Sequence, residues 1–150
     1  MTDAVAEVER AMIAIRRSQQ RRSLSGIART RGRGAHDPVI ELLDVVEEFS
    51  ERGESGTVTA LGTALGVDQP RASRLVARAV ERGLLRREAD QRDGRRTVLV
   101  LTGDGRAELD ELHQFRRGVF AEVMADWSEE DRVVFGRLLT TFVRRFGELG

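Results

Sequence analysis

Apolar residues recur at every third or fourth position over most of the chain, and this spacing predicts amphipathic α-helices. Over residues 3–20 the apolar stripe consists of Val5, Val8, Met12 and Ile15. A second helix is predicted from Asp37, because a carboxylate suited to the N-cap here precedes Pro38 at the first helical position. The apolar stripe of this second helix consists of Ile40, Leu43, Val46 and Phe49.

Two short helices joined by a tight turn are predicted next. The first is expected over residues 60–65, with Thr59 as its N-cap. The second is expected over residues 69–82, with Asp68 or Gln69 as its N-cap. The apolar positions of the second helix share one face: Ala72, Leu75, Val76, Ala79 and Val80. A helix pair with a short, glycine-containing turn is typical of a helix-turn-helix.

After the second of these helices the apolar period changes from 3.6 to 2, which predicts two strands, residues 84–89 and 97–101. Asp93 and Gly94 lie between them and form a strong hairpin-turn signal. A two-stranded hairpin is marginal alone, so it must pack against the preceding helices. The order helix, helix, hairpin predicts a winged helix.

The last third of the chain predicts two more helices, which begin near Thr102 and at Ser128. Five of the six phenylalanines and the only tryptophan, Trp127, lie in this part of the chain, beyond residue 100. Because these helices and the first one are not needed to complete the winged helix, a second copy of the chain is the simplest cover for their apolar faces. We therefore expect an obligate homodimer.

The predicted fold class is mainly α with a small β-hairpin wing (α+β), a winged helix-turn-helix within a helical homodimer. Residues 37–102 would form the DNA-binding lobe of one continuous protomer. Residues 1–36 and 103–150 would form its helical dimerisation lobe.

Composition narrows the function classes. The 150 residues include no cysteine, which excludes disulfides, cysteine-ligated zinc, iron–sulfur clusters and thiol sensing. No apolar run approaches the ~20 residues needed to span a bilayer. The N-terminus does not resemble a signal peptide. We expect a cytoplasmic protein without a membrane partner.

The formal net charge of zero conceals an uneven distribution. All 25 basic residues are arginine, and residues 57–102 hold nine of them against five acids. Local potential rather than net charge attracts phosphate, so this middle segment can bind a polyanion.

The outward face of the helix over residues 69–82 has the chemistry of a DNA-reading surface. In a helix-turn-helix this face enters the major groove, and the Arg74 guanidinium can donate two hydrogen bonds to guanine O6 and N7. The alternative is a solvated face that carries arginine for solubility. The expected DNA-binding residues of this helix are Gln69, Pro70, Arg71, Ser73, Arg74 and Arg78.

The hairpin concentrates basic residues in the same way. Its expected DNA-binding residues are Arg86, Arg87, Asp90, Arg92, Asp93, Arg95 and Arg96. In this interpretation the two carboxylates hold the loop rigid while free guanidinium groups enter the minor groove. The alternative is a polar tip of mixed charge.

The stretch from Thr57 to Val76, the following Glu81-Arg-Gly-Leu-Leu-Arg-Arg and the wing from Asp90 to Thr102 resemble the MarR family of transcriptional regulators. The resemblance implies a dimeric winged-helix protein, usually a repressor, that a small ligand releases from a palindromic operator. It carries over Asp90, Arg92 and Arg95 as wing residues, and Gln69, Pro70, Ser73 and Arg74 as recognition-helix residues. Two features depart from the family: the segment from Gly26 to Ala35 is rich in glycine and arginine, and the reactive cysteine of the thiol-sensing branch is missing.

Other function classes find little support. The two histidines, His36 and His113, lie far apart in sequence and outside any metal-spaced cluster, so we expect no enzyme, no metal and no cofactor. Arg16 is a candidate for binding an anionic small-molecule effector. The competing interpretation is a winged helix that contacts proteins or binds DNA without an operator.

Overall fold

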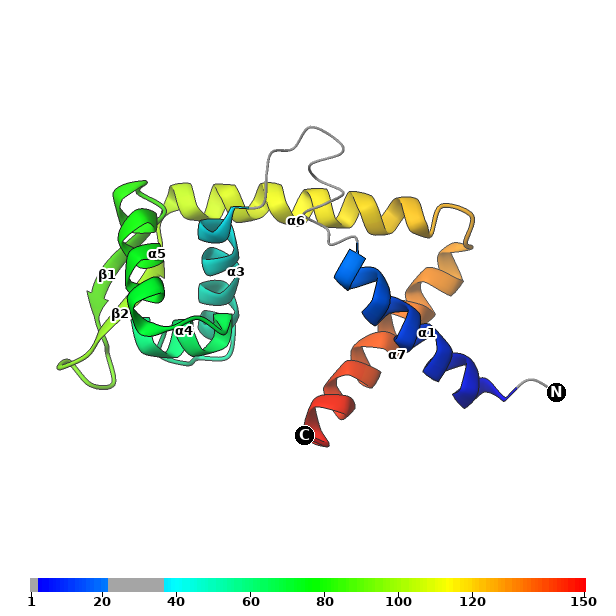
Figure 1. Ribbon diagram of the computed structural model, residues 1–150. Helices are drawn as coiled ribbons and strands as arrows, with labels where there is room; N and C mark the ends of the chain where they lie inside the picture. Colours follow the sequence, from blue (N-terminus) through cyan, green and yellow to red (C-terminus); the bar gives the residue numbers. More distant parts are fainter. Residues whose placement is uncertain (1–2, 22–36) are drawn as a thin grey trace. The chain divides into compact units, whose positions relative to one another are not determined.

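The computed structural model describes residues 3–21 and 37–150 (Figure 1). In chain order the elements are α1 (Ala4–Arg21), α3 (Pro38–Glu51), α4 (Val58–Leu65), α5 (Gln69–Glu81), β1 (Leu85–Ala89), β2 (Thr97–Leu101), α6 (Gly103–Val123) and α7 (Glu129–Glu148). The described residues up to Glu111 form one compact unit, and Leu112–Gly150 form a second. The segment from Gly26 to Ala35, which the sequence marked as unusual, lies outside the described residues. The two lobes expected from the sequence stay a prediction.

Side-chain caps fix where most of the helices begin. The Asp37 carboxylate accepts a hydrogen bond from the Val39 amide at 3.0 Å, and Pro38 occupies the first turn of α3 as predicted. Ser128 caps α7 in the same way, through the Asp131 amide. At the start of α6 the Thr102 hydroxyl accepts from the Gly105 amide. These caps satisfy amides that lack a partner within the helix.

The predicted N-cap of α4 is wrong by two residues. Thr57, not Thr59, has extended backbone angles, and its hydroxyl accepts from the Ala60 amide at 3.2 Å. The cause is a contact with a residue distant in sequence. The Leu99 amide donates to the Gly56 carbonyl at 2.9 Å, so the backbone just before the helix is still paired with β2. The helix therefore starts at the first of the two threonines.

The core of the first unit lies between α3, α4, α5 and the hairpin. Its buried side chains include Leu42, Leu43, Leu61, Leu75, Val76, Leu85, Leu99 and Leu109. The predicted stripe of α5 is confirmed, except that Val80 is half-buried. In α3 the buried face is rotated slightly from the predicted one, because Val39 and Leu42 are buried whereas Ile40 and Phe49 are only half-buried.

The helix-turn-helix depends on close contact between α4 and α5. Gly66 ends α4 with a left-handed φ of 69°, a conformation that favours glycine. Asp68 then caps α5 by accepting from the Arg71 amide at 2.8 Å. Where the two helices meet, a Cβ added to Gly62 would lie 2.8 Å from the Ala72 Cβ. A hydrogen atom at position 62 therefore allows α5 to approach α4 this closely.

Replacing Gly62 with alanine is expected to lower the free energy of unfolding by about 1–3 kcal/mol, because the new methyl overpacks the contact with Ala72. Urea denaturation of the variant and the wild type measures the loss. Gly103→Ala is the matched control: no atom of the described residues lies within 4 Å of a Cβ added there. Its stability should stay within about 0.5 kcal/mol of wild type. Equal losses in the two variants would contradict the packing argument.

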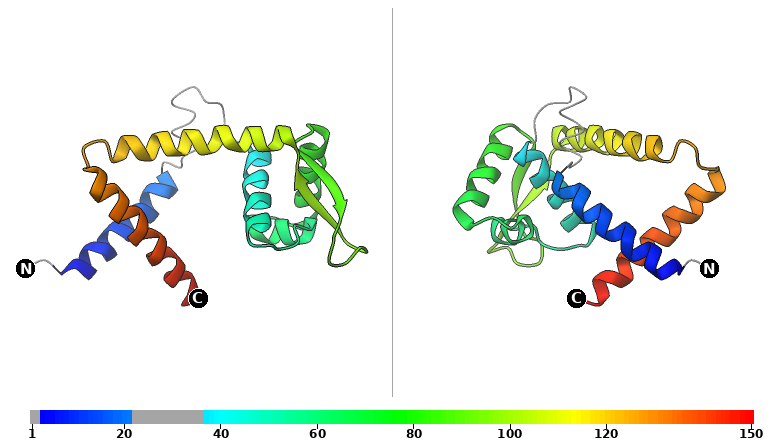
Figure 2. Two further views of the ribbon diagram at one scale, coloured as in Figure 1. Left: turned by 180° about the vertical axis from the view of Figure 1, so that it is seen from behind. Right: turned by 45° about the vertical axis from the view of Figure 1, so that its right-hand side comes forward.

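The hairpin is the predicted wing. β1 and β2 pair antiparallel, with Leu85 opposite Leu101 and Ala89 opposite Thr97. Figure 2 (left) shows the hairpin beside α5, with its tip projecting away from the helices. The Asp90 amide donates a hydrogen bond to the Arg96 carbonyl at 2.9 Å, which closes the loop. At the tip of the loop, the Arg96 amide donates to the Asp93 carbonyl and forms a turn. The loop is thus longer than a two-residue hairpin, and Gly94 does not use a positive φ.

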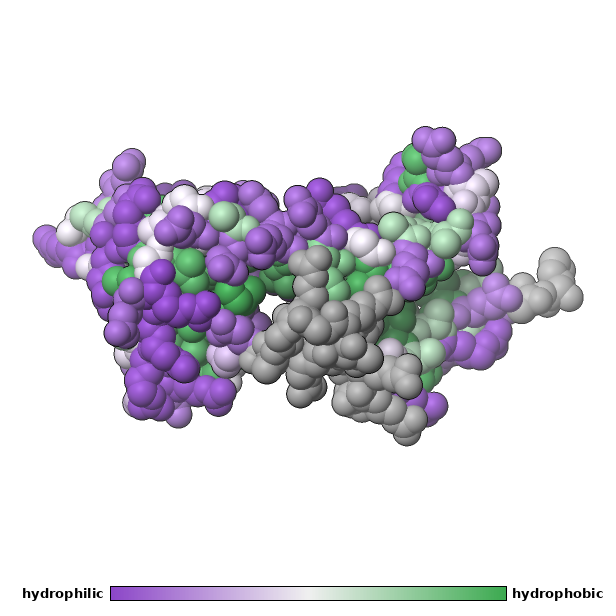
Figure 3. All heavy atoms as spheres, turned by 90° about the horizontal axis from the view of Figure 1, so that it is seen from above, coloured by the Kyte–Doolittle hydropathy of each residue, from purple (hydrophilic) through white to green (hydrophobic). Residues whose placement is uncertain are grey.

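The second unit has a largely exposed apolar surface. No residue of α7 is buried. Its large exposed side chains include Phe135, Leu138, Leu139, Phe142 and Phe146. The Trp127 and Phe135 rings touch edge to face, with centroids 5.1 Å apart. Hydrophobic residues also reach the surface on the face of the molecule viewed in Figure 3.

Candidate nucleic-acid interface

The outer face of α5 presents all the residues expected to read DNA. Gln69, Pro70, Arg71, Ser73, Arg74 and Arg78 are exposed. The opposite face carries the buried Ala72, Leu75, Val76 and Ala79, so the core fixes which way the helix faces. Within the described part of the chain, the guanidinium groups of Arg71, Arg74 and Arg78 form no ion pair. Their hydrogen-bond donors are therefore available to a ligand.

The far end of α5 is tied to the start of α3. Arg82, the C-cap of α5, donates to the Asp37 carboxylate at 2.8 Å. Partial burial raises the pKa of Asp37, but the hydrogen bonds from Arg82 and the Val39 amide and the charges of Arg82 and Arg78 outweigh it, so the pKa is lowered. The same carboxylate therefore caps α3 and anchors the candidate reading helix.

Arg82→Ala is expected to cost a few tenths to about 1 kcal/mol of stability at neutral pH, the range of a solvent-exposed pair. Because the folded protein lowers the pKa of Asp37, the pair stabilises fully above the unfolded value of about 3.9 and is lost as pH falls through the folded value. The deficit of the variant relative to wild type should therefore shrink as the pH falls below about 3.9, and vanish once Asp37 is protonated in the folded protein. Urea denaturation across this pH range measures it.

Arg95→Ala is the control for this titration, because Arg95 is an exposed arginine with no ion pair among the described residues. It should show no such pH-dependent difference from wild type. A deficit in Arg82→Ala that persists unchanged at acid pH would rule out the Asp37 pair as its cause.

The structure divides the predicted wing residues into two groups. Arg86 pairs with Glu88 at 2.7 Å, and Arg96 pairs with Asp90 at 3.2 Å, so these two guanidinium groups have partners. Arg87, Arg92 and Arg95 form no ion pair among the described residues and are exposed. The cations that remain available on the wing are therefore these three.

Both carboxylates of the wing hold its loop together. Asp90 is only 6% exposed, and its carboxylate accepts from the Arg92 amide at 3.0 Å and from the Ser55 hydroxyl at 2.8 Å. These two hydrogen bonds keep the pKa of Asp90 below its ordinary value, and the one from the Arg92 amide has the larger effect. Asp93 accepts from the Arg95 amide at 3.1 Å. Asp90 is thus buried and holds the loop from inside, whereas Asp93 is exposed to solvent.

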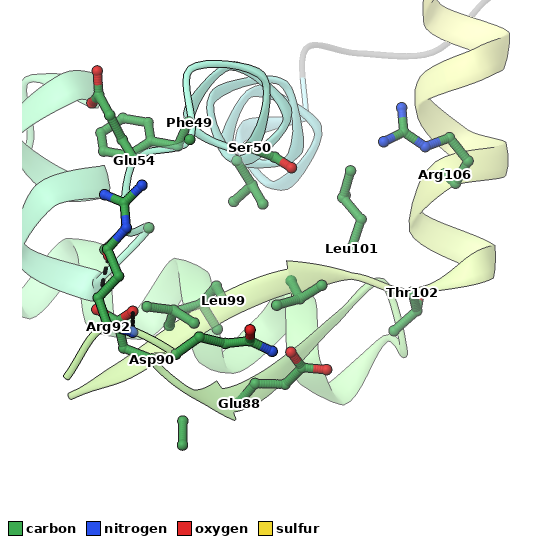
Figure 4. A pocket seen from close by; sticks show the side chains of 18 of the residues that line it. Phe49, Ser50, Glu54, Glu88, Asp90, Arg92, Leu99, Leu101, Thr102 and Arg106 are labelled. Atoms are coloured by element: carbon green, nitrogen blue, oxygen red, sulfur yellow. Dashed lines mark hydrogen bonds between the residues drawn. The ribbon is translucent and has the colours of Figure 1, made fainter. Parts of the chain in front are cut away.

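Arg92 does not extend towards the tip of the wing. Its guanidinium lies near Gly53, where an added Cβ would be 3.6 Å from Nη2. Figure 4 shows the side chain directed from the wing towards Glu54 and Phe49. Arg92 must therefore change rotamer to reach a phosphate or a groove beyond the tip, whereas Arg95 already lies in the terminal turn.

A pocket of about 750 Å³ lies beside the root of the wing (Figure 4). Val46 and Phe49 of α3 form one wall, and Val98 and Val100 of β2 form another. Arg106 of α6 lies at the rim, where it pairs with Glu47. Asp90 and Arg92 complete the lining at the wing.

Sequence reasoning missed both the pocket and Ser55. The run Thr97–Leu101 is apolar on both faces of its strand, which is the one sequence signal that its outer face also has cover. Ser55 gave no signal, because its partner Asp90 is 35 residues away. Arg16, the candidate effector residue, is exposed on α1 and does not line the pocket. No helix among the described residues has the length and apolar character to cross a membrane.

Residues 42–96 match the model of the MarR family. A MarR family protein from Bacillus stearothermophilus is 22% identical, with a TM-score of 0.70 over 98% of this chain and 99% of that one. RV1404 from Mycobacterium tuberculosis is 22% identical, with a TM-score of 0.65 over 98% and 97%. A probable transcriptional regulator from Pseudomonas aeruginosa is 27% identical, with a TM-score of 0.52 over 86% and 93%. No curated protein sequence matches this chain. The likeness confirms the predicted winged-helix fold class.

Proposed function

Because this chain belongs to the MarR family of transcriptional regulators, we propose that it represses transcription as a homodimer bound to a pseudo-palindromic operator in double-stranded DNA. A small-molecule effector releases it. In this role the protein is a non-enzymatic regulator, and its output is the occupancy of a promoter.

The observation that carries the proposal is the outer face of α5. Arg71, Arg74 and Arg78 are exposed there without ion pairs among the described residues, on a helix that the core and two anchored ends hold in place. Guanidinium groups on a fixed helix are suited to bidentate hydrogen bonds with guanine in the major groove. Arg95 in the wing turn adds a cation for the backbone or the minor groove.

The apolar surface of the second unit supports the homodimer. A solvent-exposed row that includes Phe135, Leu138 and Phe142 would be costly in a monomer. A two-fold partner covers the same surface on both copies at once. Two copies also supply two α5 helices, which a palindrome with two half-sites requires.

The pocket at the wing root supports control by an effector. Its lining combines apolar side chains of α3 and β2 with polar and charged side chains of the wing and α6, so it can hold a small molecule that has both an apolar part and polar groups. A ligand in it would touch Asp90 and Arg92, which also shape the wing. Binding there would therefore favour one wing position and change the affinity for DNA.

Selection of bound fragments from random duplex DNA at near-physiological salt tests the proposal. We expect enrichment of a pseudo-palindrome whose half-sites are about 10 base pairs apart, one helical turn. Placing that site across a promoter in a purified transcription reaction should then lower transcript yield. Retention without an enriched motif would leave a non-specific DNA binder. No retention would contradict the proposal and favour a winged helix that contacts proteins.

A further inference from the structure

The wing is attached to the segment between α3 and α4 at two points. The Leu99 amide of β2 donates to the Gly56 carbonyl at 2.9 Å. One residue earlier, the Ser55 hydroxyl donates to the Asp90 carboxylate at 2.8 Å. The first contact holds the middle of β2, and the second holds the point where β1 ends and the loop begins. The loop beyond Asp90 has no comparable attachment to the helices among the described residues.

Asp90 connects Ser55 to the loop of the wing. One of its oxygens accepts from the Arg92 amide at 3.0 Å, and the oxygen that binds Ser55 also lies 3.2 Å from the Arg96 guanidinium. The Asp90 amide donates to the Arg96 carbonyl, which joins the two sides of the loop. The residues that precede and follow Arg95 are thus organised around one carboxylate that Ser55 holds in place.

We propose that Ser55 is a positioning residue for DNA binding: its hydroxyl fixes Asp90 and thereby sets the direction in which the wing presents Arg92 and Arg95. The proposal rests on the proposed function, because those two arginines matter only if the wing meets DNA. Ser55 itself is half-buried beside the pocket and does not read a base.

The hydroxyl is needed because the carboxylate is buried. A charged oxygen that loses a hydrogen bond away from water is costly, and hydrogen bonds to charged groups are stronger than neutral ones. Without the Ser55 hydroxyl, Asp90 must take up water in its place, and the loop must move to admit it. The Gly56–Leu99 contact would remain, so the strands should stay paired while the loop changes position.

Backbone hydrogen exchange in the absence of DNA tests the first half of the proposal. In Ser55→Ala we expect the amides of Asp90, Arg92 and Arg96 to exchange about ten times faster than in wild type, the loss expected for one charge-assisted hydrogen bond. Amides of α3 and α5 should keep their rates. Ser50→Ala is the matched control: Ser50 is an exposed hydroxyl that lines the same pocket and forms no side-chain hydrogen bond within the described part of the chain.

Operator affinity tests the second half. Ser55→Ala should bind about three to ten times more weakly, and Ser55→Thr, which keeps the hydroxyl, should recover most of the loss. In a chain that already carries Arg92→Ala and Arg95→Ala, adding Ser55→Ala should change affinity by less than about twofold. If Ser55 only stabilised the fold, Ser55→Ala would instead lower operator affinity by the same factor in both backgrounds.

Three results would overturn the proposal: unchanged exchange of the three wing amides in Ser55→Ala, equal acceleration in α3 and α5, or an affinity loss that persists without Arg92 and Arg95. A wild-type protein that binds no DNA would overturn the proposed function, and with it the role of Ser55 in DNA binding. The exchange data would still decide whether Ser55 holds the wing.

Discussion

Replacing Leu138 with glutamate is expected to convert the protein from a dimer to a monomer and to weaken operator binding by at least about a hundredfold. Leu138 is 53% exposed, so the change removes little packing within one chain. It would bury two charges in the apolar centre of the proposed interface, which is strongly unfavourable. Losing the second half-site contact then removes the gain that comes from binding both half-sites together. Sedimentation equilibrium and operator titration measure the two effects.

Thr140→Glu is the matched control for this substitution. Thr140 is exposed on α7 about 200° around the helix from Leu138, away from Phe135, Phe142 and Phe146. It should remain dimeric and bind the operator normally. A wild-type mass of 16.8 kDa in solution would contradict the homodimer itself. A dimeric Leu138→Glu variant would show that α7 lies outside the interface.

Arg74→Ala is expected to weaken operator binding by about 1–3 kcal/mol and to relax base preference at one position of each half-site. The cause is the loss of two donors that match guanine O6 and N7 from the exposed face of α5. Affinities for a set of operators, each changed at one base pair, measure the effect. The discrimination at that position should fall while discrimination elsewhere is kept.

Arg95→Ala provides the comparison, because Arg95 belongs to the wing turn and not to α5. It should weaken binding to all sequences evenly and reduce the slope of affinity against salt concentration by about one. If Arg74→Ala bound every operator as tightly as wild type, α5 would not be the reading helix. If Arg74→Ala lowered the affinity for all sequences by the same factor, Arg74 would contact a phosphate and not a base.

The parts of the fold that the sequence predicted depend on local signals. Asp37, Asp68 and Ser128 cap the helices that follow them within three residues, so their effect can be read from neighbouring letters. The direction of α5 was predictable for the same reason: its buried stripe repeats with the helical period and leaves one face for solvent.

Features that depend on distant partners could not be predicted in this way. Thr57 and Thr59 are equally good caps, and only the pairing of Gly56 with β2 selects the first. The contact of Arg82 with Asp37 joins residues 45 positions apart. Neither partner stands out among the many charged residues of the chain.

The wing shows the same limit on the scale of single side chains. Its arginines look alike in the sequence, yet Arg86 and Arg96 are engaged by nearby carboxylates while Arg87 and Arg95 are not. Which arginine finds a partner depends on the hairpin register and on the path of the loop. Counting charges therefore located the candidate surface but not the groups available for DNA.

Operator affinity as a function of the spacing between half-sites tests the proposed two-fold dimer most directly. A two-fold dimer with a fixed distance between its α5 helices requires the half-sites to face it about one helical turn apart. Starting from the selected operator, we expect an insertion of about 5 base pairs, half a turn, to reduce the affinity to that of a single half-site. Affinity that is independent of spacing would contradict binding as a two-fold dimer, because each chain would then bind DNA alone.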